Sequence, residues 1–305
     1  MNIAIIDYPG ALKSAVFGLS EMFLLANQLA SEAVTEERFS VDILTINELG
    51  TRLSTRKKYT AVFLPPSIDH ESSSQPTTVL TDWLIQRYKE GSMLCSACAG
   101  LFIIAPTGVL EGKEVTTHWQ LADDFSERYP TVNLNVDKIV INDGDIITAG
   151  GMMAWLDLGL ELISQLISPK VMRQLGKLLV VDTGLREQRY YQQFTPKFTH
   201  GDELILRIQR KLAVSLTESI KVAELAESFN LTERTFFRRF IKSTGIKPSE
   251  YIQRLRIQKA CDLLEDTTRS FELIANDVGY EDTSACRKTF KHIIGLTPRE
   301  FRNRF

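Results

Sequence analysis

The sequence predicts two domains: an α/β domain with a mostly parallel sheet and helices on both faces, followed by an all-α domain. The chain has 305 residues, which is enough for two domains of ~150 residues each. Apolar runs alternate with helical patterns in the first half, as is typical of a parallel α/β sheet. The second half has helical patterns throughout and contains an internal repeat.

Short apolar runs predict the strands of the first domain, and periodic patterns predict its helices. Strands are expected at Ile3–Ile6, Val41–Ile46, Ala61–Leu64 and Met93–Cys95. Helices are expected at Phe17–Ala30, Thr77–Tyr88 and Ala154–Ile167. Val132–Ile141 and Asp145–Thr148 flank the turn residues Asn142–Gly144, which predicts a hairpin. The order of these elements predicts a flavodoxin-like sheet.

Composition indicates a folded chain without a membrane segment. Hydrophobic residues make up 44% and charged residues 24%, which argues against a disordered or collagen-like chain. Residues 1–10 carry no positive charge ahead of their apolar stretch, and no apolar run approaches the ~20 residues of a membrane span. We therefore expect a cytoplasmic protein with no membrane partner.

The cysteines predict neither a metal site nor a disulfide framework. Cys95, Cys98, Cys261 and Cys286 do not form the double pairs that bind zinc, and they are too few for a disulfide scaffold. Reduced thiols, no metal and no cofactor are expected.

Charge is distributed unevenly along the chain. Residues 1–195 hold 16 Lys and Arg against 23 Asp and Glu, whereas residues 196–305 hold 20 against 15. The segment Thr195–Gly201 has the composition of a linker, so we place the domain boundary after Thr195. A basic domain attached to an acidic one is the expected footprint of nucleic-acid binding, although a solvated basic surface would give the same charge.

The basic half contains a repeat whose copies are offset by 49 to 50 residues. Leu225–Asn230 is echoed by Ile274–Gly279, and Phe240–Tyr251 is echoed by Phe290–Phe301. Each copy has the parts of a helix-turn-helix unit. We predict these units at about residues 220–243 and 270–292.

Local signals mark the helices of each copy. The small residues Ala226 and Ala275 allow the two helices of a copy to approach closely. Asn230 and Gly279 suit a turn position with positive φ. Thr232 and Asp282 are the expected caps of the second helix. The buried stripe of the second helices contains Phe236, Phe240, Cys286 and Phe290. A helix from about Pro248 to Glu265 would hold the two units at a separation that suits major-groove segments ~34 Å apart.

Residues 202–305 resemble the DNA-binding domain of AraC/XylS-type regulators. The resemblance covers both helix-turn-helix units, the connecting helix and the closing Gly-x-x-Pro-x-x-Tyr/Phe segments. It implies base-facing positions at Arg234, Phe237 and Arg238 in the first unit and at Thr283, Ser284, Arg287 and Lys288 in the second. Two departures are visible, because Phe237 is apolar where a polar base reader is common and Cys286 replaces a larger core residue.

The stretch from Ser92 to Phe102 predicts a strand, a sharp turn at Cys98 and a helix. Such an elbow places a thiol beside free backbone N–H groups, which lower its pKa and can stabilise an oxyanion. His118 is the candidate base for this cysteine.

Residues 1–167 resemble the class I glutamine amidotransferase-like fold of the ThiJ/PfpI group, in the form fused to AraC-type regulators. Cys98-x-Gly100 and Thr117-His118-Trp119 carry this resemblance, which implies that Cys98 is the elbow cysteine and His118 its matching histidine. The acidic residue common in enzymes of this group is replaced by Ser14 or Ala15. Without an orienting carboxylate a Cys/His pair loses much of its hydrolytic competence, so we do not expect an enzyme.

Two functions are therefore considered. In the first, the chain is a sequence-specific DNA-binding transcription regulator, in which residues 1–195 sense a small molecule and dimerise and residues 196–305 bind a promoter. The partners are double-stranded DNA, an effector, a second copy of the chain and RNA polymerase. The alternative is a Cys98-dependent hydrolase or amidase whose helical half directs it to DNA.

The ligand is expected at the carboxyl ends of the parallel strands. The residues expected near it are Cys98, His118, Trp119, Gly150, Gly151 and Met152. The resemblance implies a nitrogen-containing effector such as an amino acid or a quaternary amine, with cation–π contact from Trp119 or Trp155.

Overall fold

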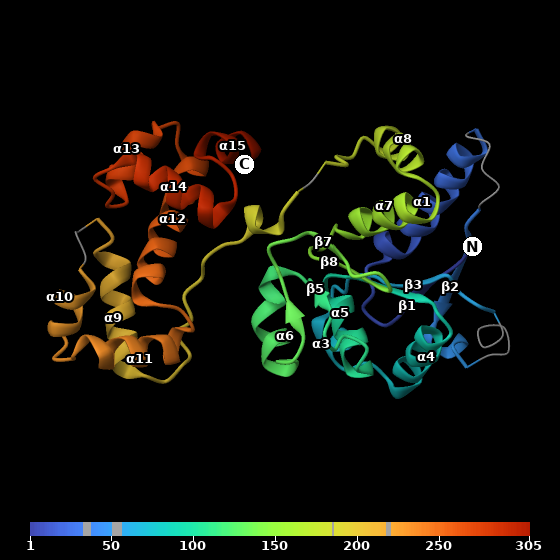
Figure 1. Ribbon diagram of the computed structural model, residues 1–305, viewed down its shortest axis with the longest axis horizontal. Helices are drawn as coiled ribbons and strands as arrows, with labels where there is room; N and C mark the ends of the chain where they lie inside the picture. Colours follow the sequence, from blue (N-terminus) through green and yellow to red (C-terminus); the bar gives the residue numbers. More distant parts are fainter. Residues whose placement is uncertain (33–37, 51–56, 185, 218–220) are drawn as a thin grey trace. The chain divides into compact units, whose positions relative to one another are not determined.

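The computed structural model describes residues 1–32, 38–50, 57–184, 186–217 and 221–305. The chain forms two compact units, Met1–Gln188 and Arg189–Phe305, each with its own hydrophobic core (Figure 1). Residues 218–220, where the first helix-turn-helix unit was predicted to begin, lie outside the described residues. None of the described helices has the length and apolar character needed to cross a membrane.

The boundary between the units follows Gln188 rather than Thr195. Residues that follow Gln188 pack on the helical unit: Arg189 and Tyr190 lie against Gly295, and the ring of Phe194 packs on Tyr251 at a centroid distance of 5.4 Å. Composition identified the linker-like stretch but not these contacts.

A six-stranded sheet forms the centre of the α/β unit. Its strands are β1 (Asn2–Asp7), β2 (Ser40–Thr45), β3 (Ala61–Leu64), β4 (Met93–Ala97), β7 (Val140–Asn142) and β8 (Ile146–Ala149). The order is β2-β1-β3-β4-β8-β7, and only β7 runs antiparallel to its neighbour. β3 and β8 are buried along their whole length, because helices cover both faces of the sheet.

Helices lie on both faces of this sheet, as predicted (Figure 1). One layer contains α1 (Lys13–Glu32), α7 (Trp155–Leu166) and α8 (Pro169–Leu179), which contact one another. The opposite layer contains α3 (His70–Ser74), α4 (Thr78–Lys89) and α5 (Leu101–Ile104). A further helix, α6 (Ala122–Arg128), lies beside a small parallel pair, β5 (Glu114–Val115) and β6 (Asn133–Leu134).

One predicted strand is wrong. Residues 132–141 do not form a single strand, because a turn in which the Asn135 side chain accepts from the Asp137 N–H separates β6 from β7. The predicted hairpin across Asn142–Gly144 is confirmed as β7 and β8. Helices α3, α6 and α8 were not predicted; α8 begins with a Ser168 cap followed by Pro169, a recognisable start signal.

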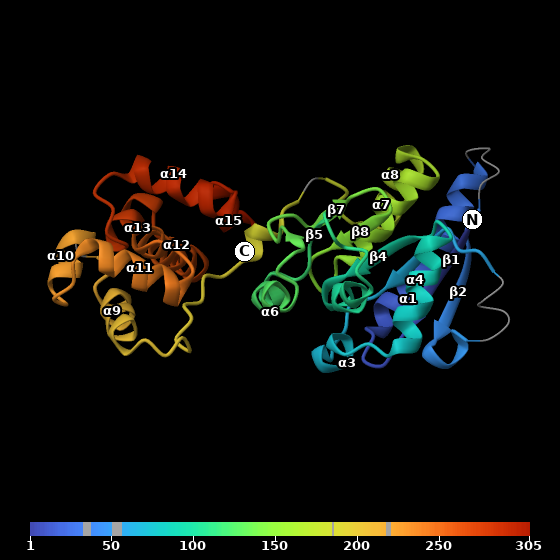
Figure 2. The same cartoon turned by 60° about the horizontal axis from the view of Figure 1, so that its bottom comes forward.

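In the described part of the second unit, all regular secondary structure is helical. Its helices are α9 (Glu203–Val214), α10 (Val222–Glu227), α11 (Glu233–Thr244), α12 (Pro248–Asp266), α13 (Phe271–Asp277), α14 (Thr283–Ile294) and α15 (Pro298–Arg304). Figures 1 and 2 show α12 between the pair α10–α11 and the pair α13–α14. Each pair has its own apolar cluster, one around Phe236 and Phe240 and the other around Cys286 and Phe290.

The local signals predicted for the repeat are confirmed. The Thr232 side chain accepts from the Thr235 N–H at the start of α11, and the Asp282 side chain accepts from the Ser284 N–H at the start of α14. The turns place Asn230 at φ 56° and Gly279 at φ 84°. Both pairs are therefore helix-turn-helix units of the same design.

Separate cores predict separate losses of stability. Phe63→Ala should cost the α/β unit ~3–5 kcal/mol, and Phe290→Ala should cost the helical unit a similar amount, because each removes a fully buried ring. In calorimetry, each variant should lower one transition and serve as the control for the other. A variant that lowered both transitions equally would contradict two independent cores.

Candidate functional site

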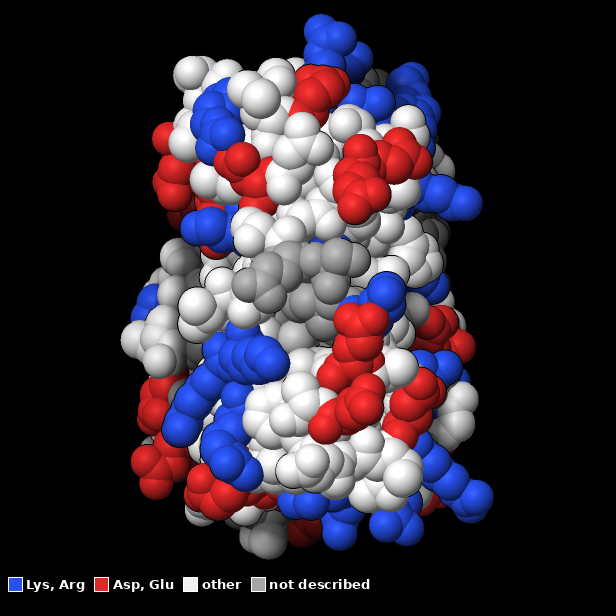
Figure 3. All heavy atoms as spheres, turned by 90° about the vertical axis from the view of Figure 1, so that its left-hand side faces the viewer, with Lys and Arg blue, Asp and Glu red and all other residues white. Residues whose placement is uncertain are grey.

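The second helix of each helix-turn-helix unit exposes polar side chains on one face. In α11, Arg234 and Arg238 are exposed one turn apart. In α14, Ser284 and Lys288 occupy the equivalent positions of the repeat and are also exposed. Figure 3 views the molecule from the left-hand side of Figure 1, and basic and acidic side chains are interspersed over the surface that it shows.

Of the other predicted base-facing residues, two are half-buried, and Arg287 is exposed but engaged in contacts within its own unit. Phe237 is half-buried and packs edge-on against Phe236, with ring centroids 6.3 Å apart. Arg287, its counterpart in the second unit, lies over the Phe271 ring at 5.5 Å and pairs with Glu272 at 3.3 Å. Thr283 is half-buried at the start of α14. Arg287 thus contacts the first helix of its pair, α13, whereas the ring contact of Phe237 lies within α11.

Arg239 has a structural role that sequence analysis did not identify. It donates two hydrogen bonds, at 2.9 and 2.7 Å, to the Asp202 carboxylate that caps α9. The guanidinium and the helix N–H groups together lower the pKa of Asp202. This pair joins α9 to α11 and so supports the helix that carries Arg234 and Arg238.

The predicted elbow at Cys98 is present. β4 ends at Ala97, Cys98 has the left-handed φ of 54°, and a short 3-10 turn (Cys98–Gly100) leads into α5. The thiol is only 3% exposed, and burial raises its pKa to about 11. The expected lowering is therefore wrong, because the hydrogen bond from the Ala99 N–H lowers the pKa by less than desolvation raises it.

His118 is not hydrogen-bonded to Cys98 among the described contacts. Its Nδ1 accepts from the Gln120 N–H at 3.1 Å, and its ring stacks on Trp119 with centroids 5.7 Å apart. Burial lowers the pKa of His118, so the neutral ring is favoured. Asp7, the last residue of β1, pairs with Lys13. The structure does not assemble a charged Cys/His pair with an orienting acid.

Cys98, Trp119 and Gly150, three of the residues predicted near the ligand, are connected through Thr117 and the side chain of Gln188. Thr117 donates to the Cys98 carbonyl at 2.7 Å, and its own carbonyl accepts from the Gln188 amide at 2.9 Å. The Gln188 carbonyl accepts from the Trp119 N–H at 2.7 Å, and its amide nitrogen lies directly over Gly150. Sequence analysis missed Gln188, because nothing local marks a long-range contact.

Two further residues predicted near the ligand, Gly151 and Met152, follow Gly150 in the chain. Gly151 has a φ of 113°, a conformation that favours glycine, and Met152 is 38% exposed. Trp155, proposed for cation–π contact, is instead a core residue: it is buried, and its ring packs on Gly18 of α1. Trp119 is half-buried.

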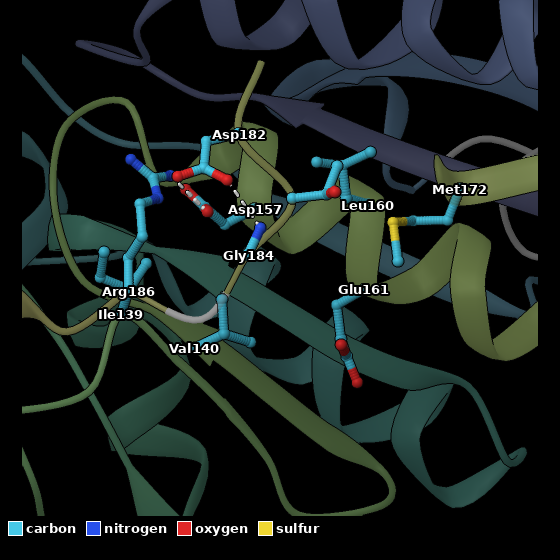
Figure 4. Close-up of a pocket in the computed structure, with 10 residues that line it drawn as sticks. Ile139, Val140, Asp157, Leu160, Glu161, Met172, Asp182, Gly184 and Arg186 are labelled. Carbon is cyan, nitrogen blue, oxygen red and sulfur yellow. Dashed lines mark hydrogen bonds and ion pairs between the residues drawn. The ribbon is translucent and has the colours of Figure 1, made fainter. Parts of the chain in front are cut away.

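A cavity of about 150 Å³ lies elsewhere in the α/β unit, between β7, α7 and the segment that follows α8. Apolar side chains of Ile139, Val140, Leu160 and Met172 line it together with the acids Asp157, Glu161 and Asp182. Figure 4 shows Arg186 reaching Asp157, with the two groups 2.5 Å apart. Burial raises the pKa of Asp157, although Arg186 opposes that shift. No group of three or more metal-ligating side chains occurs in the described parts of the chain.

Comparisons with known proteins find a match to a known family in each unit. Residues 225–304 match the helix-turn-helix domain family, and residues 38–165 match the DJ-1/PfpI family. The chain is 28% identical over 302 residues to the HTH-type transcriptional regulator ArgR of Pseudomonas aeruginosa, covering 96% of this chain and 90% of that protein. It is 27% identical to the HTH-type transcriptional regulator CdhR of the same organism, covering 74% of this chain and 67% of that protein.

A solved structure supports the fold of the α/β unit. It is that of a candidate transcriptional regulator from Vibrio parahaemolyticus, with a TM-score of 0.52 and 18% identity. The match covers 59% of this chain and 98% of that one.

The raised pKa of Cys98 predicts slow, pH-dependent alkylation. Because the thiolate is the reacting form, the rate with iodoacetamide should rise roughly tenfold per pH unit up to about pH 10, without an earlier plateau. Mass spectrometry of the Cys98 peptide would measure the rate, with Cys98→Ser identifying alkylation of the other cysteines. A plateau near neutral pH would show an activated thiolate instead.

Proposed function

We propose that this chain, an AraC-type transcriptional regulator with a DJ-1/PfpI domain, binds a specific DNA site with its helical unit and senses a small metabolite with its α/β unit. The observation that carries the proposal is the repeated helix-turn-helix unit with exposed polar side chains at equivalent positions. The proposed sensor is the unit Met1–Gln188, and the proposed DNA-binding part is the unit Arg189–Phe305.

The geometry of the helical unit suits the major groove. An α-helix fits that groove, and Arg or Lys can bind guanine through hydrogen bonds, while Ser reads bases less selectively. The connecting helix α12 has 19 residues and is about 28 Å long, comparable with the ~34 Å that separate successive major-groove segments on one face. We assign direct base contact to Arg234, Arg238, Ser284 and Lys288.

The effector, the second copy of the chain and RNA polymerase are proposed partners. A dimer would double the DNA contacts and so raise affinity for a two-part site. An effector that binds the sensor would shift the equilibrium between DNA-bound and free forms. DNA as the partner places the proposed activity in the cytoplasm.

An amine-bearing effector agrees with the chemistry of the α/β unit. The cavity beside α7 has the acids Asp157, Glu161 and Asp182 together with apolar walls. Carboxylates and an apolar surface complement an amino acid or a quaternary amine.

The hydrolase alternative is less favoured by the geometry of the elbow. The Cys98 thiol has a pKa of about 11. The Nδ1 atom of His118, through which an acid would orient the ring, accepts from the Gln120 N–H instead. A nucleophilic cysteine needs a lowered pKa or an adjacent base. The relatives named for transcriptional regulation point in the same direction.

Selection of genomic fragments by the full chain, at physiological salt with excess competitor DNA, should recover a common site. On that site Arg238→Ala should cost ~1–3 kcal/mol and relax the preference at one base pair. Arg210→Ala is the matched control, because it removes an exposed arginine of α9 from the same unit. An equal loss of DNA affinity in both variants would mean that only net charge matters. Recovery of no common DNA site would contradict the proposed regulator function.

Ligand binding should stabilise the α/β unit by mass action. In a thermal-shift series of amino acids and quaternary amines, at least one compound should raise the melting temperature of the wild-type chain. Asp182→Asn should reduce that shift if the ligand is held in the cavity beside α7. A series in which no amine acts would contradict the proposed effector class.

A further inference from the structure

Gln188 is buried in a polar site made by three segments of the α/β unit. Its side chain, within a residue that is only 2% exposed, donates to the carbonyl oxygens of Thr117 and Val136 at 2.9 and 3.0 Å. Its carbonyl accepts from the Trp119 N–H at 2.7 Å. Gly150 forms the floor, where a Cβ would overlap the amide nitrogen. We name this site, made by Thr117, Trp119, Val136 and Gly150, the amide cradle.

The amide cradle is complementary to one functional group. The three closest partners of the Gln188 amide are two carbonyl acceptors at its nitrogen, which has two N–H bonds, and one backbone donor at its oxygen. The Thr116 hydroxyl and the Lys138 carbonyl lie farther from the nitrogen, at 3.4 Å each. A carboxylate would place negative oxygen against the two carbonyls, and an ammonium group would leave the Trp119 N–H without its acceptor. A primary carboxamide satisfies all three partners.

The residues after Gln188 are held along the helical unit. Arg304 lies over the Tyr190 ring at 5.2 Å and donates to the Tyr191 hydroxyl at 3.2 Å. The Phe194 N–H donates to Gln258 of α12 at 2.8 Å. Gln209 of α9 donates to the Lys197 carbonyl at 3.1 Å. We name residues 189–201 the strap.

The amide cradle therefore anchors the chain at the last residue of one unit, and the strap begins with the next residue. A short 3-10 turn, Gln188–Tyr191, contains both the anchor and the start of the strap. While Gln188 occupies the cradle, almost no free chain separates the two anchored segments. The backbone is held there as well, because the Gln188 N–H donates to the Asp137 carbonyl at 2.6 Å and Glu187 forms an antiparallel bridge with Lys138. Release of the side chain would lengthen the connection only if it also opened these backbone contacts.

We propose that Gln188 is a built-in occupant of a primary-carboxamide site, and that a carboxamide-bearing effector competes with it and releases the strap from the α/β unit. The regulatory meaning rests on the proposed sensing role of that unit. The carboxamide site itself is independent of DNA binding.

Propionamide is the matched probe, because it has the same heavy atoms as the side chain that Gln188→Gly removes. In the full chain, Gln188→Gly should lower the melting temperature of the α/β unit and speed hydrogen exchange of residues 187–192 about tenfold. Propionamide should restore the melting temperature saturably but leave exchange fast, because the bound amide is no longer part of the chain. Propionate should restore neither.

The wild-type chain tests the competition. Propionamide, at concentrations well above those that half-saturate Gln188→Gly, should speed exchange of residues 187–192, whereas propionate should not. Gln193→Gly, at an exposed glutamine of the strap, is the control and should leave both melting and exchange unchanged. If Gln188→Gly fails to fold, Gln188→Met keeps the volume without the hydrogen bonds and should also speed exchange.

The outcomes separate the two proposals. Equal action of propionamide and propionate, or unchanged exchange in Gln188→Gly and Gln188→Met, would overturn the carboxamide site whatever the chain does on DNA. Wild-type exchange that propionamide leaves unchanged would overturn the competition. Failure to select a DNA site would instead concern the regulator and leave the carboxamide measurements valid.

Discussion

The close approach of the carboxyl ends of β3 and β4 constrains the whole functional end of the α/β unit. Gly100 leaves no space for a side chain, because a Cβ there would overlap the carbonyl of Leu64. The chain can therefore turn sharply at Cys98 and begin α5 at once. The Cys98 carbonyl then accepts a hydrogen bond from the Thr117 hydroxyl, and the Thr117 carbonyl accepts one from the Gln188 side-chain amide. One steric constraint thus positions the elbow, the loop after β5 and the end of the unit.

The helical unit shows how a repeat keeps its scaffold while its surface diverges. Caps, turns and apolar stripes match between the two copies, so both pairs of helices pack alike. The exposed positions differ, since Arg234 corresponds to Ser284 and Phe237 corresponds to Arg287. Arg287 lies over the Phe271 ring of α13, whereas Phe237 packs edge-on against Phe236 of its own helix. The two units can therefore differ in the bases they favour without differing in fold.

Sequence patterns predicted the features that depend on neighbouring residues. The strands at residues 3–6 and 61–64, the hairpin, the caps at Thr232 and Asp282 and the turn at Asn230 are set by local periodicity and backbone preference. The environment of Cys98 could not be predicted, because its pKa depends on burial by distant segments. Gln188 was missed for the same reason, since its partners lie 50 or more residues away in the chain. The likeness to known families supplied the candidate ligand residues but not the side chain that lies among them.

The strap also determines where such a chain can be divided or recombined. Tyr190, Tyr191 and Phe194 cover surfaces of the helical unit, so a fragment that began after Thr195 would lose three aromatic rings and expose the groups beneath them. An exchange of sensor units between related chains would have to join upstream of Arg189 to keep the helical unit intact. The incoming sensor would also need its own glutamine at the junction and a glycine beneath it. Modularity in this architecture is therefore limited by one short turn, to which both modules contribute.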